Sequence, residues 1–372
     1  MNHAFPARRI RHGSNPGTSR LIAWVLSSFI CFAFSVSAQE KMVFATVIMR
    51  HGDRTPFDNI AGENPGSWPE GFGKLTELGK KQVYTNGLVM RQLYCPGLFD
   101  SNNAASSVRV FSTDWDRTRL SAQGFLTGLV GLAAPSIPIE TNVSIDITAG
   151  ISATNAITAE SLLNPHNDPD YFKRLASQYV FSKPEWIATN RALKPQMNRW
   201  SRAMGRRIPD IDYLVALASA LYACQVHQHP PPRGLSPDDV EAIISAGHWA
   251  RVYQFSGEAG RITGRPLLRK VAQYMKNARD EELSQKKARL KFILFSAHDT
   301  TLLSVMSALG APLTGDHEPP YASYLHFALF ETDPANFNVR VTYHDDQDRV
   351  VPNPANGGAS WSLDQLLKWA GQ

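Results

Sequence analysis

Three groups of charged and histidine side chains each follow a short apolar run. They lie in the segments RHGDRTP (residues 50–56), STDWDRT (residues 112–118) and SAHDTT (residues 296–301). The side chains in them that could do chemistry are Arg50, His51, Arg54, Arg117, His298 and Asp299. The planar fork of arginine matches an oxyanion with several acceptor oxygens and stays charged at any working pH. The combination indicates binding and transfer of such an anion.

Each residue type has a definite task in phosphoryl transfer. The three arginines can neutralise the equatorial oxygens of a phosphoryl group without a metal ion. Their charges disfavour the imidazolium form of His51, so its attacking nitrogen stays unprotonated at lower pH than usual. Asp299 is the carboxylate that directly follows His298, and it can protonate a leaving alcohol and then activate water. The pattern predicts a covalent phosphohistidine on His51 and no metal or other cofactor.

The elements that must position these residues can be predicted from the same segments. Residues 42–49 form a continuous apolar, β-branched run typical of a strand buried on both faces, and residues 108–111 and 292–295 are shorter runs of the same kind. Helices are expected over residues 76–93 and 302–309. This alternation predicts an α/β fold with a mostly parallel sheet and helices on both faces. Ligands bind outside the carboxyl ends of such strands, so the three groups are expected to converge.

The middle of the chain has a different pattern. Residues 211–226 and 237–255 are compatible with helices, and prolines interrupt the surrounding sequence. We interpret residues 151–260 as a mainly helical cap inserted into the α/β core. The predicted organisation is a signal peptide over residues 1–38, the first part of the core over 39–150, the cap over 151–260 and the second part of the core over 261–372.

The N-terminal segment has the pattern of an export signal. Residues 1–20 contain four arginines and no acidic residue, residues 21–36 are apolar and uncharged, and small residues precede a cleavage site after Ala38. The apolar run is shorter than the roughly 20 residues of a membrane span. An uncleaved anchor helix is the alternative reading. We expect an exported, soluble mature chain without stable membrane insertion, in an extracellular, periplasmic or lysosome-like compartment that depends on the host.

Removal of residues 1–38 changes the charge balance. The whole chain carries 38 basic and 33 acidic side chains, and the segment takes four arginines with it, which leaves 34 against 33. A nucleic-acid-binding protein would keep its basic excess in the folded part, so a nucleic-acid partner is not expected. Two cysteines remain, Cys95 and Cys224, and they leave both a disulfide and two buried thiols open.

No single group carries the functional prediction. The tripeptide Arg11-His12-Gly13 repeats the Arg-His-Gly of the first group, with no strand before it. By itself, Arg117 could pair with a neighbouring aspartate at a helix start, and the His298-Asp299-Thr300 run could cap a helix. The inference depends on the strand before His51, the offsets to Arg54 and Pro56, and the presence of all three groups.

Together the three groups resemble the histidine acid phosphatase family, and are most similar to its prostatic and lysosomal members. The segments SWPEGFGKLTELG (residues 67–79) and PPYASY (residues 319–324) resemble that subgroup too, and the resemblance is weak between residues 122 and 292. It implies an α/β fold with a helical cap and a small-molecule phosphomonoester as substrate. It also implies His51 as nucleophile, Asp299 as proton donor, and Arg50, Arg54, Arg117 and His298 as phosphate ligands. Dimers are common in the subgroup, which leaves a homodimer open.

The chain departs from the mammalian members in its cysteines. Those members carry several disulfides, and the stretch around Cys224 resembles one of their cysteine positions. Tyr324 stands where its partner cysteine would be expected. This departure bears on the disulfide and not on the chemistry.

Two alternative functions remain. A phytase of the same family would often have Asn at a position held here by Thr300 or Thr301, with a strongly basic pocket rim. A metal-dependent phosphoesterase could use His227 and His229, but that pair runs into three prolines without an adjacent carboxylate or cysteine. The acidic run Asp345, Asp346 and Asp348 is expected to be a solvated hairpin or loop. Asn142 is a glycosylation acceptor only in a eukaryotic host.

Overall fold

The computed structural model describes residues 40–59, 65–101, 104–141, 144–145, 157–165, 171–285, 289–311, 317–333, 335–345 and 348–371. The predicted signal peptide, the glycosylation acceptor Asn142 and Asp346 lie outside these residues. Residues 38–372 belong to one compact unit, so the division into a core and a separate cap domain stays a prediction.

The strands come from both ends of the described chain. They are β1 (Lys41–Arg50), β2 (Val108–Ser112), β3 (Ile139–Glu140), β4 (Ser144–Ile145), β5 (Ile157–Thr158), β6 (Phe292–Ala297), β7 (Tyr324–Asp333), β8 (Asn336–His344), β9 (Asp348–Val350) and β10 (Trp361–Ser362). The three apolar runs predicted to be strands are β1, β2 and β6, each extended by one or two residues.

The helices lie between and after these strands. They are α1 (Glu77–Tyr94), α2 (Ala104–Ser107), α3 (Asp116–Val130), α4 (Ala159–Leu163), α5 (Pro184–Met204), α6 (Ile211–Val226), α7 (Pro237–Gln254), α8 (Gly257–Leu283), α9 (Asp299–Leu309) and α10 (Leu363–Gly371). A π-helix spans Tyr171–Phe181, and short 3₁₀ helices span Pro65–Ser67 and Gly131–Ser136. The helices expected over residues 76–93, 211–226, 237–255 and 302–309 are α1, α6, α7 and α9.

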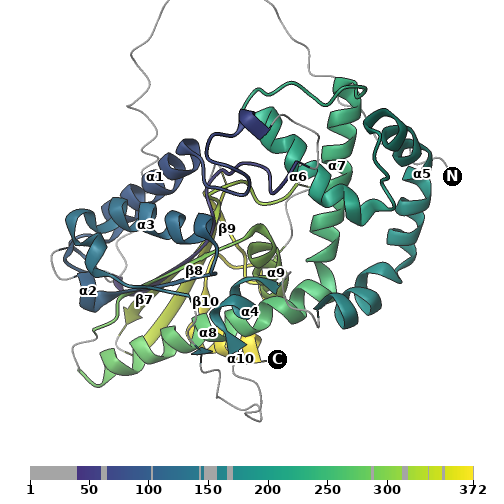
Figure 1. Ribbon diagram of the computed structural model, residues 1–372. Helices are drawn as coiled ribbons and strands as arrows, with labels where there is room; N and C mark the ends of the chain where they lie inside the picture. Colours follow the sequence, from purple (N-terminus) through teal and green to yellow (C-terminus); the bar gives the residue numbers. More distant parts are fainter. Residues whose placement is uncertain are drawn as a thin grey trace, which may run out of the picture. The chain divides into compact units, whose positions relative to one another are not determined.

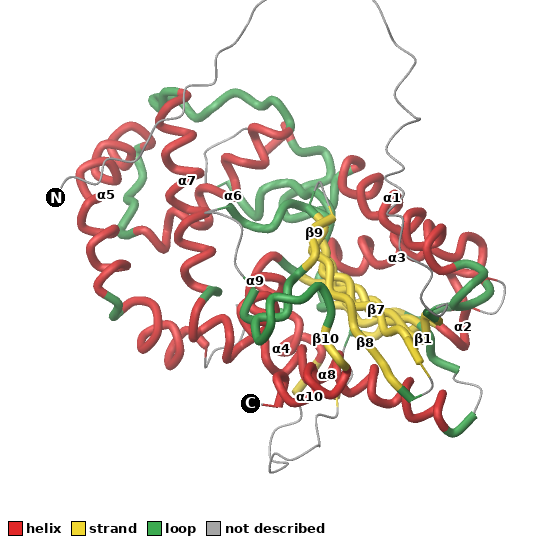
Figure 2. The backbone as a smooth tube through the Cα atoms, turned by 180° about the vertical axis from the view of Figure 1, so that it is seen from behind, coloured by secondary structure: helices red, strands yellow, loops and turns green. Residues whose placement is uncertain are grey.

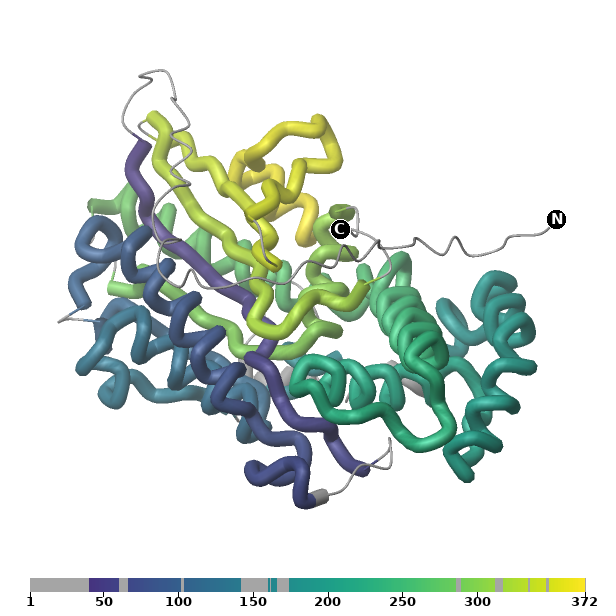
Figure 3. Tube along the Cα trace, turned by 90° about the horizontal axis from the view of Figure 1, so that it is seen from above, coloured from purple at the N-terminus to yellow at the C-terminus, as the bar shows by residue number. Residues whose placement is uncertain are grey.

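Most of the strands join one mixed sheet. Its order is β10–β8–β7–β1–β6–β2–β3, with β9 paired to β8. The pairs β1–β6, β6–β2 and β2–β3 are parallel, whereas β7 is antiparallel to both β1 and β8. The α/β class and a partly parallel sheet are therefore confirmed, and the antiparallel strands extend a sheet whose parallel part was predicted. Figure 3 shows β1 beside strands from the C-terminal part of the chain.

The sheet is covered on both faces, as the continuous apolar strands require. Along β1, Val47 and Met49 pack into one cluster with residues of α1 and α3, and Ile48 faces a second cluster with residues of α8 and α9. This alternation follows from the two-residue period of a strand. Figures 1 and 2 show α1 and α3 on one side of the sheet and α8, α9 and α10 on the other.

The segment predicted to be a cap is mainly helical where it is described. It contains α4, the π-helix, α5, α6 and α7, with β5 as a short strand before them. α6 packs extensively against α7, and α8 then returns along the sheet to pack against α9. The predicted cap boundary at residue 260 therefore falls in the first turn of α8.

Two further sequence readings can be compared with the structure. No disulfide joins Cys95 and Cys224 in the described part of the chain: Cys95 packs beside the α1–α3 core, and Cys224 is buried against Trp68. β8 and β9 pair as antiparallel strands with His344 opposite Asp348, as expected for a hairpin, whereas the Asp345 side chain is only 11 % exposed and pairs with Arg349. No helix of the described residues is long and apolar enough to cross a membrane.

Candidate active site

The end of β1 places the first polar group. The backbone N–H of Arg50 donates to the carbonyl of Ser323 at 2.9 Å, and the N–H of His51 donates to the carbonyl of Ala297 at 3.0 Å. The His51 carbonyl accepts from the N–H of Ala322 at 3.0 Å. Hydrogen bonds to the end of β6 and to the segment before β7 therefore fix the backbone of Arg50 and His51.

The loop after His51 is anchored by two helices. The hydroxyl of Thr76, the N-cap of α1, donates to Asp53 Oδ2 at 2.5 Å. His227 Nε2 lies 2.7 Å from the same oxygen. His227 thus supports the loop from the end of α6, while His229 stacks on Trp68 with ring centroids 4.3 Å apart. Within the described residues, no group of three or more His, Cys, Asp or Glu side chains is arranged to hold a metal ion.

Arg117 enters the site from the first turn of α3. It is buried, with 4 % of its surface exposed. Its neighbour Arg119, rather than Arg117, pairs with Asp114 and Asp116. The local ion pairs that the sequence left open for Arg117 are thus made two residues further on, by Arg119, and Arg117 lines the cavity.

His298 and Asp299 stand at the start of α9, directly after β6. His298 is the N-cap residue, and its backbone N–H donates to the hydroxyl of Thr301 at 3.2 Å. Its Nε2 lies 3.0 Å from the hydroxyl of Thr113. Asp299 accepts the Thr300 N–H at 2.7 Å through Oδ1, and its Oδ2 lies 3.4 Å from Arg50 Nη2. The N-termini of α3 and α9 both point positive partial charge at this region.

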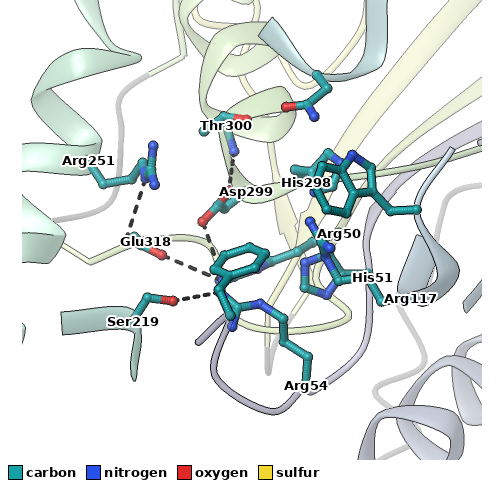
Figure 4. A pocket seen from close by; sticks show the side chains of 13 residues that line it. Arg50, His51, Arg54, Arg117, Ser219, Arg251, His298, Asp299, Thr300 and Glu318 are labelled. Atoms are coloured by element: carbon teal, nitrogen blue, oxygen red, sulfur yellow. Dashed lines mark hydrogen bonds and ion pairs between the residues drawn. The ribbon is translucent and has the colours of Figure 1, made fainter. Parts of the chain in front are cut away.

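The six residues predicted from sequence line one cavity of about 230 Å³. Figure 4 shows Arg50, His51, Arg54, Arg117 and His298 gathered together, with Asp299 above them. The cavity is completed by residues that the sequence patterns did not identify, which are Phe57, Trp115, Asn164, Ser219, Arg251, Thr300 and Glu318. The residues that follow β1, β2 and β6 therefore do converge on one cavity, as predicted.

The environment of His51 favours a neutral ring. Its Nδ1 lies 2.8 Å from the carbonyl of Gly52. Because a carbonyl oxygen only accepts, Nδ1 must carry the hydrogen, which leaves the lone pair on Nε2. Burial, followed by the charge of Arg117, holds the pKa of His51 well below its usual range. The ring can therefore act as a nucleophile in acid.

The arginines provide buried donors that the protein leaves unused. The Nε atoms of Arg50, Arg54 and Arg117 are buried and have no hydrogen-bond partner among the described residues. Burial, followed by the charge of Arg54, lowers the pKa of Arg117 to about 9, so it remains cationic in neutral and acidic solution. Three buried arginine cations lining one cavity indicate an anionic ligand.

Several residues that shape the cavity had weak sequence signals or none. Trp115 lies inside the STDWDRT motif, and Glu318 directly precedes PPYASY, so proximity to a motif could have marked both. Ser219 on α6 and Arg251 on α7 belong to unremarkable helical stretches. Arg54 Nη2 donates to Ser219 Oγ at 2.7 Å, so α6 contributes directly to the site.

The sequence of this chain is similar to those of known acid phosphatases over most of its length. The chain is 28% identical to lysosomal acid phosphatase of Bos taurus over 315 residues, which cover 82% of this chain and 71% of that protein. It is 28% identical to prostatic acid phosphatase of Bos taurus over 346 residues, which cover 90% of this chain and 85% of that protein.

The fold is shared with solved structures at lower identity. Hafnia alvei phytase in complex with myo-inositol hexakis sulphate superposes with a TM-score of 0.64 at 15% identity, covering 90% of this chain and 98% of that chain. The inositol hexasulfate complex of Bifidobacterium longum multiple inositol polyphosphate phosphatase gives 0.58 at 13% identity, covering 90% and 93%. The family model described as histidine phosphatase superfamily (branch 2) matches residues 41–344, and the chain belongs to that family.

Proposed function

We propose that this chain is a metal-independent acid phosphatase that hydrolyses phosphomonoesters through a phosphohistidine on His51. One observation carries the proposal: the unprotonated Nε2 of a buried His51 belongs to a cavity that three buried arginines also line. Positioning and charge neutralisation are the main requirements of phosphoryl transfer, and the arginines supply both.

The residues divide the reaction into two steps. His51 Nε2 attacks phosphorus and the bond to the leaving alcohol breaks, while Arg50, Arg54 and Arg117 neutralise the equatorial oxygens. His298, fixed by Thr113, serves as a further phosphate ligand. Asp299 gives its proton to the leaving oxygen and later takes one from the water that attacks the phosphohistidine.

The electrostatics support activity in acid. The pKa of His298 is also well below its usual range because the ring is buried and Arg117 is close. Both histidines therefore remain neutral as the pH falls below 6, where a free imidazole would be protonated. The names of the matched acid phosphatases agree with this expectation, and the lysosomal relatives also support an exported enzyme.

The cavity favours a monoester of modest charge over a phytase substrate. Beyond the three phosphate-binding arginines, the described residues of the lining contribute one more cation, Arg251, which faces Glu318 at 4.0 Å. The remaining lining includes the aromatic side chains of Phe57 and Trp115. A ring with many phosphates would need more cations at the rim. Inositol hexakisphosphate is therefore expected to be a poorer substrate than simple monoesters.

Trapping of the intermediate tests the proposal. Wild-type enzyme incubated with a labelled phosphomonoester in EDTA at pH 5 should turn over and, when quenched in alkali, retain label that acid then removes. His51→Ala should retain no label and lose at least about a thousandfold in kcat, because removal of a nucleophile leaves only binding and electrostatic stabilisation. His344→Ala, a histidine in the β8–β9 hairpin, is the matched control and should behave as wild type. Turnover that continues in His51→Ala, or without any labelled enzyme, contradicts the mechanism.

A further inference from the structure

Glu318 is a buried carboxyl group that the two proposed steps do not use. Its side chain is 6 % exposed, and its Oε2 lies 3.6 Å from Arg50 Nη2. The same Arg50 nitrogen lies 3.4 Å from Asp299 Oδ2. The two carboxyl groups therefore meet at one guanidinium nitrogen. Two carboxylates held this close repel each other, and a proton on one of them removes the repulsion.

Glu318 faces charged and titratable groups from every element around it. These are Arg50 at the end of β1, Asp299 on α9, Arg251 and His248 on α7, Tyr222 on α6, and His317 and Tyr321 of its own segment. Burial, followed by the charge of Asp299, raises the pKa of Glu318 to about 8. Burial alone would raise the pKa of Asp299 as well, but Arg50 and Arg251 outweigh it and hold that pKa well below its usual range. In the substrate-free site the shared proton therefore resides on Glu318.

This placement bears on the proposed general acid. Asp299 must hold a proton when the alcohol leaves, yet Arg50 stabilises its ionised form in the free enzyme. A phosphate monoester that binds Arg50 brings negative charge to the guanidinium that stabilises Asp299. Asp299 then loses part of that stabilisation, and a proton donor at the same guanidinium can restore its acid form.

We propose that Glu318 is a positioning residue that shares one proton with Asp299 and transfers it to Asp299 when a phosphomonoester engages Arg50. The proposal rests on the proposed function, and it concerns a residue outside the three motifs. It explains why an acidic side chain is buried beside the general acid, where it would otherwise add repulsion. Figure 4 shows both carboxyl groups reaching Arg50, with Arg251 on the far side of Glu318.

The proton balance closes over one turnover. In the first step the N–P bond forms, the P–O bond to the alcohol breaks, and the shared proton passes from Asp299 to the leaving oxygen, so the pair holds none. In the second step the oxygen of water attacks phosphorus and its proton returns to the pair. The N–P bond breaks, its electron pair returns to Nε2, and inorganic phosphate leaves. The pair again holds one proton.

The test compares two leaving groups in Glu318→Gln. Glycerol 2-phosphate releases a poor leaving group that needs a general acid, whereas p-nitrophenyl phosphate releases a stable phenolate that does not. At pH 6.5 the variant should lose at least about tenfold in kcat on glycerol 2-phosphate, within the range of general acid catalysis. Its kcat on p-nitrophenyl phosphate should stay within about threefold of wild type. The alkaline limb of the kcat profile on glycerol 2-phosphate should move toward acid, because Asp299 alone loses its proton at lower pH.

Two further variants complete the experiment. Glu331→Gln makes the same change on β7 opposite Lys41, at the other end of β1 from Arg50, and should match wild type on both esters. Glu318→Asp keeps an ionisable carboxyl group and should recover part of the glycerol 2-phosphate activity. Hydrolysis of p-nitrophenyl phosphate by Glu318→Gln shows that the variant is folded.

The possible failures are distinguishable. Equal losses on both esters at every pH, or an unchanged pH profile, overturn the role of Glu318 while leaving the phosphatase function in place. If Glu318→Gln does not fold, Glu318→Asp is compared with wild type on the same two esters. If the ratio of kcat on glycerol 2-phosphate to kcat on p-nitrophenyl phosphate is the same in both proteins, the role of Glu318 is overturned. A wild-type enzyme that hydrolyses neither ester overturns both proposals.

Discussion

At the residue scale, the site depends on arginines whose donors are aimed by their neighbours. Arg54 gives one nitrogen to the carbonyl of Thr55 at 2.9 Å and another to Ser219 Oγ at 2.7 Å. The same guanidinium lies 3.7 Å from the centre of the Phe57 ring. Arg54 is therefore oriented by contacts from its own loop and from α6, although the motif around it contains only the loop.

Ser219→Ala tests whether α6 orients Arg54. A hydrogen bond to a charged group contributes about 1.5–3 kcal/mol, so its loss should raise KM for a small phosphomonoester by about tenfold to a hundredfold. The change in kcat should be smaller, and steady-state kinetics at pH 5 measure both. Ser219→Thr keeps the hydroxyl and serves as the control. If KM is the same for alanine, threonine and wild type, Arg54 does not depend on this contact.

At the element scale, α1 contacts the loop after β1 through backbone atoms. A Cβ on Gly79 would lie 2.2 Å from the carbonyl oxygen of Asp53, and a Cβ on Gly52 would lie 2.4 Å from the carbonyl oxygen of Gly79. Two glycines therefore let the first turn of α1 touch the loop that carries His51 and Arg54. The distance between α1 and this loop is therefore set by backbone atoms and not by flexible side chains.

Gly79→Ala should disturb both stability and activity. The added methyl group meets backbone atoms that cannot rotate away, and overpacking of this kind costs about 1–3 kcal/mol. A lower urea midpoint and a reduced kcat on p-nitrophenyl phosphate are expected together, because the displaced loop carries His51, the proposed nucleophile. Gly97→Ala is the control, since a Cβ there meets no atom within 4 Å. An alanine at position 79 that leaves the urea midpoint and kcat unchanged would contradict the close contact.

At the scale of the whole molecule, buried neutral histidines limit stability in acid. Burial lowers the pKa of His326 to about 4, and burial and Arg50 lower that of His248 to about 4. His326 contacts the Tyr94 hydroxyl and lies 3.3 Å from Thr342 Oγ1, between α1 and the antiparallel half of the sheet. A folded-state pKa below the unfolded value means that the fold disfavours the protonated ring. The contribution of such a histidine to stability is complete above pH 6.5 and is lost as the pH falls toward 4.

His326→Gln should reduce the acid sensitivity of folding. For a shift of this size the loss between pH 6.5 and pH 4 is about 3 kcal/mol. Glutamine keeps an acceptor for Tyr94 and does not titrate. Urea unfolding at pH 7 and pH 4 should show a smaller decrease in the variant than in wild type. An equal decrease in both proteins would show that His326 is not a source of the acid sensitivity.

The local elements and the candidate site residues could be predicted from the sequence. The runs that became β1, β2 and β6 could be recognised because strands buried on both faces must be continuously apolar. Their carboxyl ends had to meet because parallel strands end at one edge of a sheet. The residues that follow those strand ends are Arg50, His51, Arg54, Arg117, His298 and Asp299, and they line one cavity. Their roles in catalysis stay predictions until the variants are measured.

Only the tertiary structure decided what surrounds those six residues. Ser219 lies on α6 and Arg251 lies on α7. The spacing of apolar residues in these helices does not predict which helix face meets the sheet. Glu318 reaches Asp299 because the segment before β7 packs beside the start of α9. The sequence left His227 open as a metal ligand together with His229. In the structure the His227 ring pairs with Asp53. A periodic pattern reports contacts within an element, whereas partners across elements depend on the packing of the whole chain.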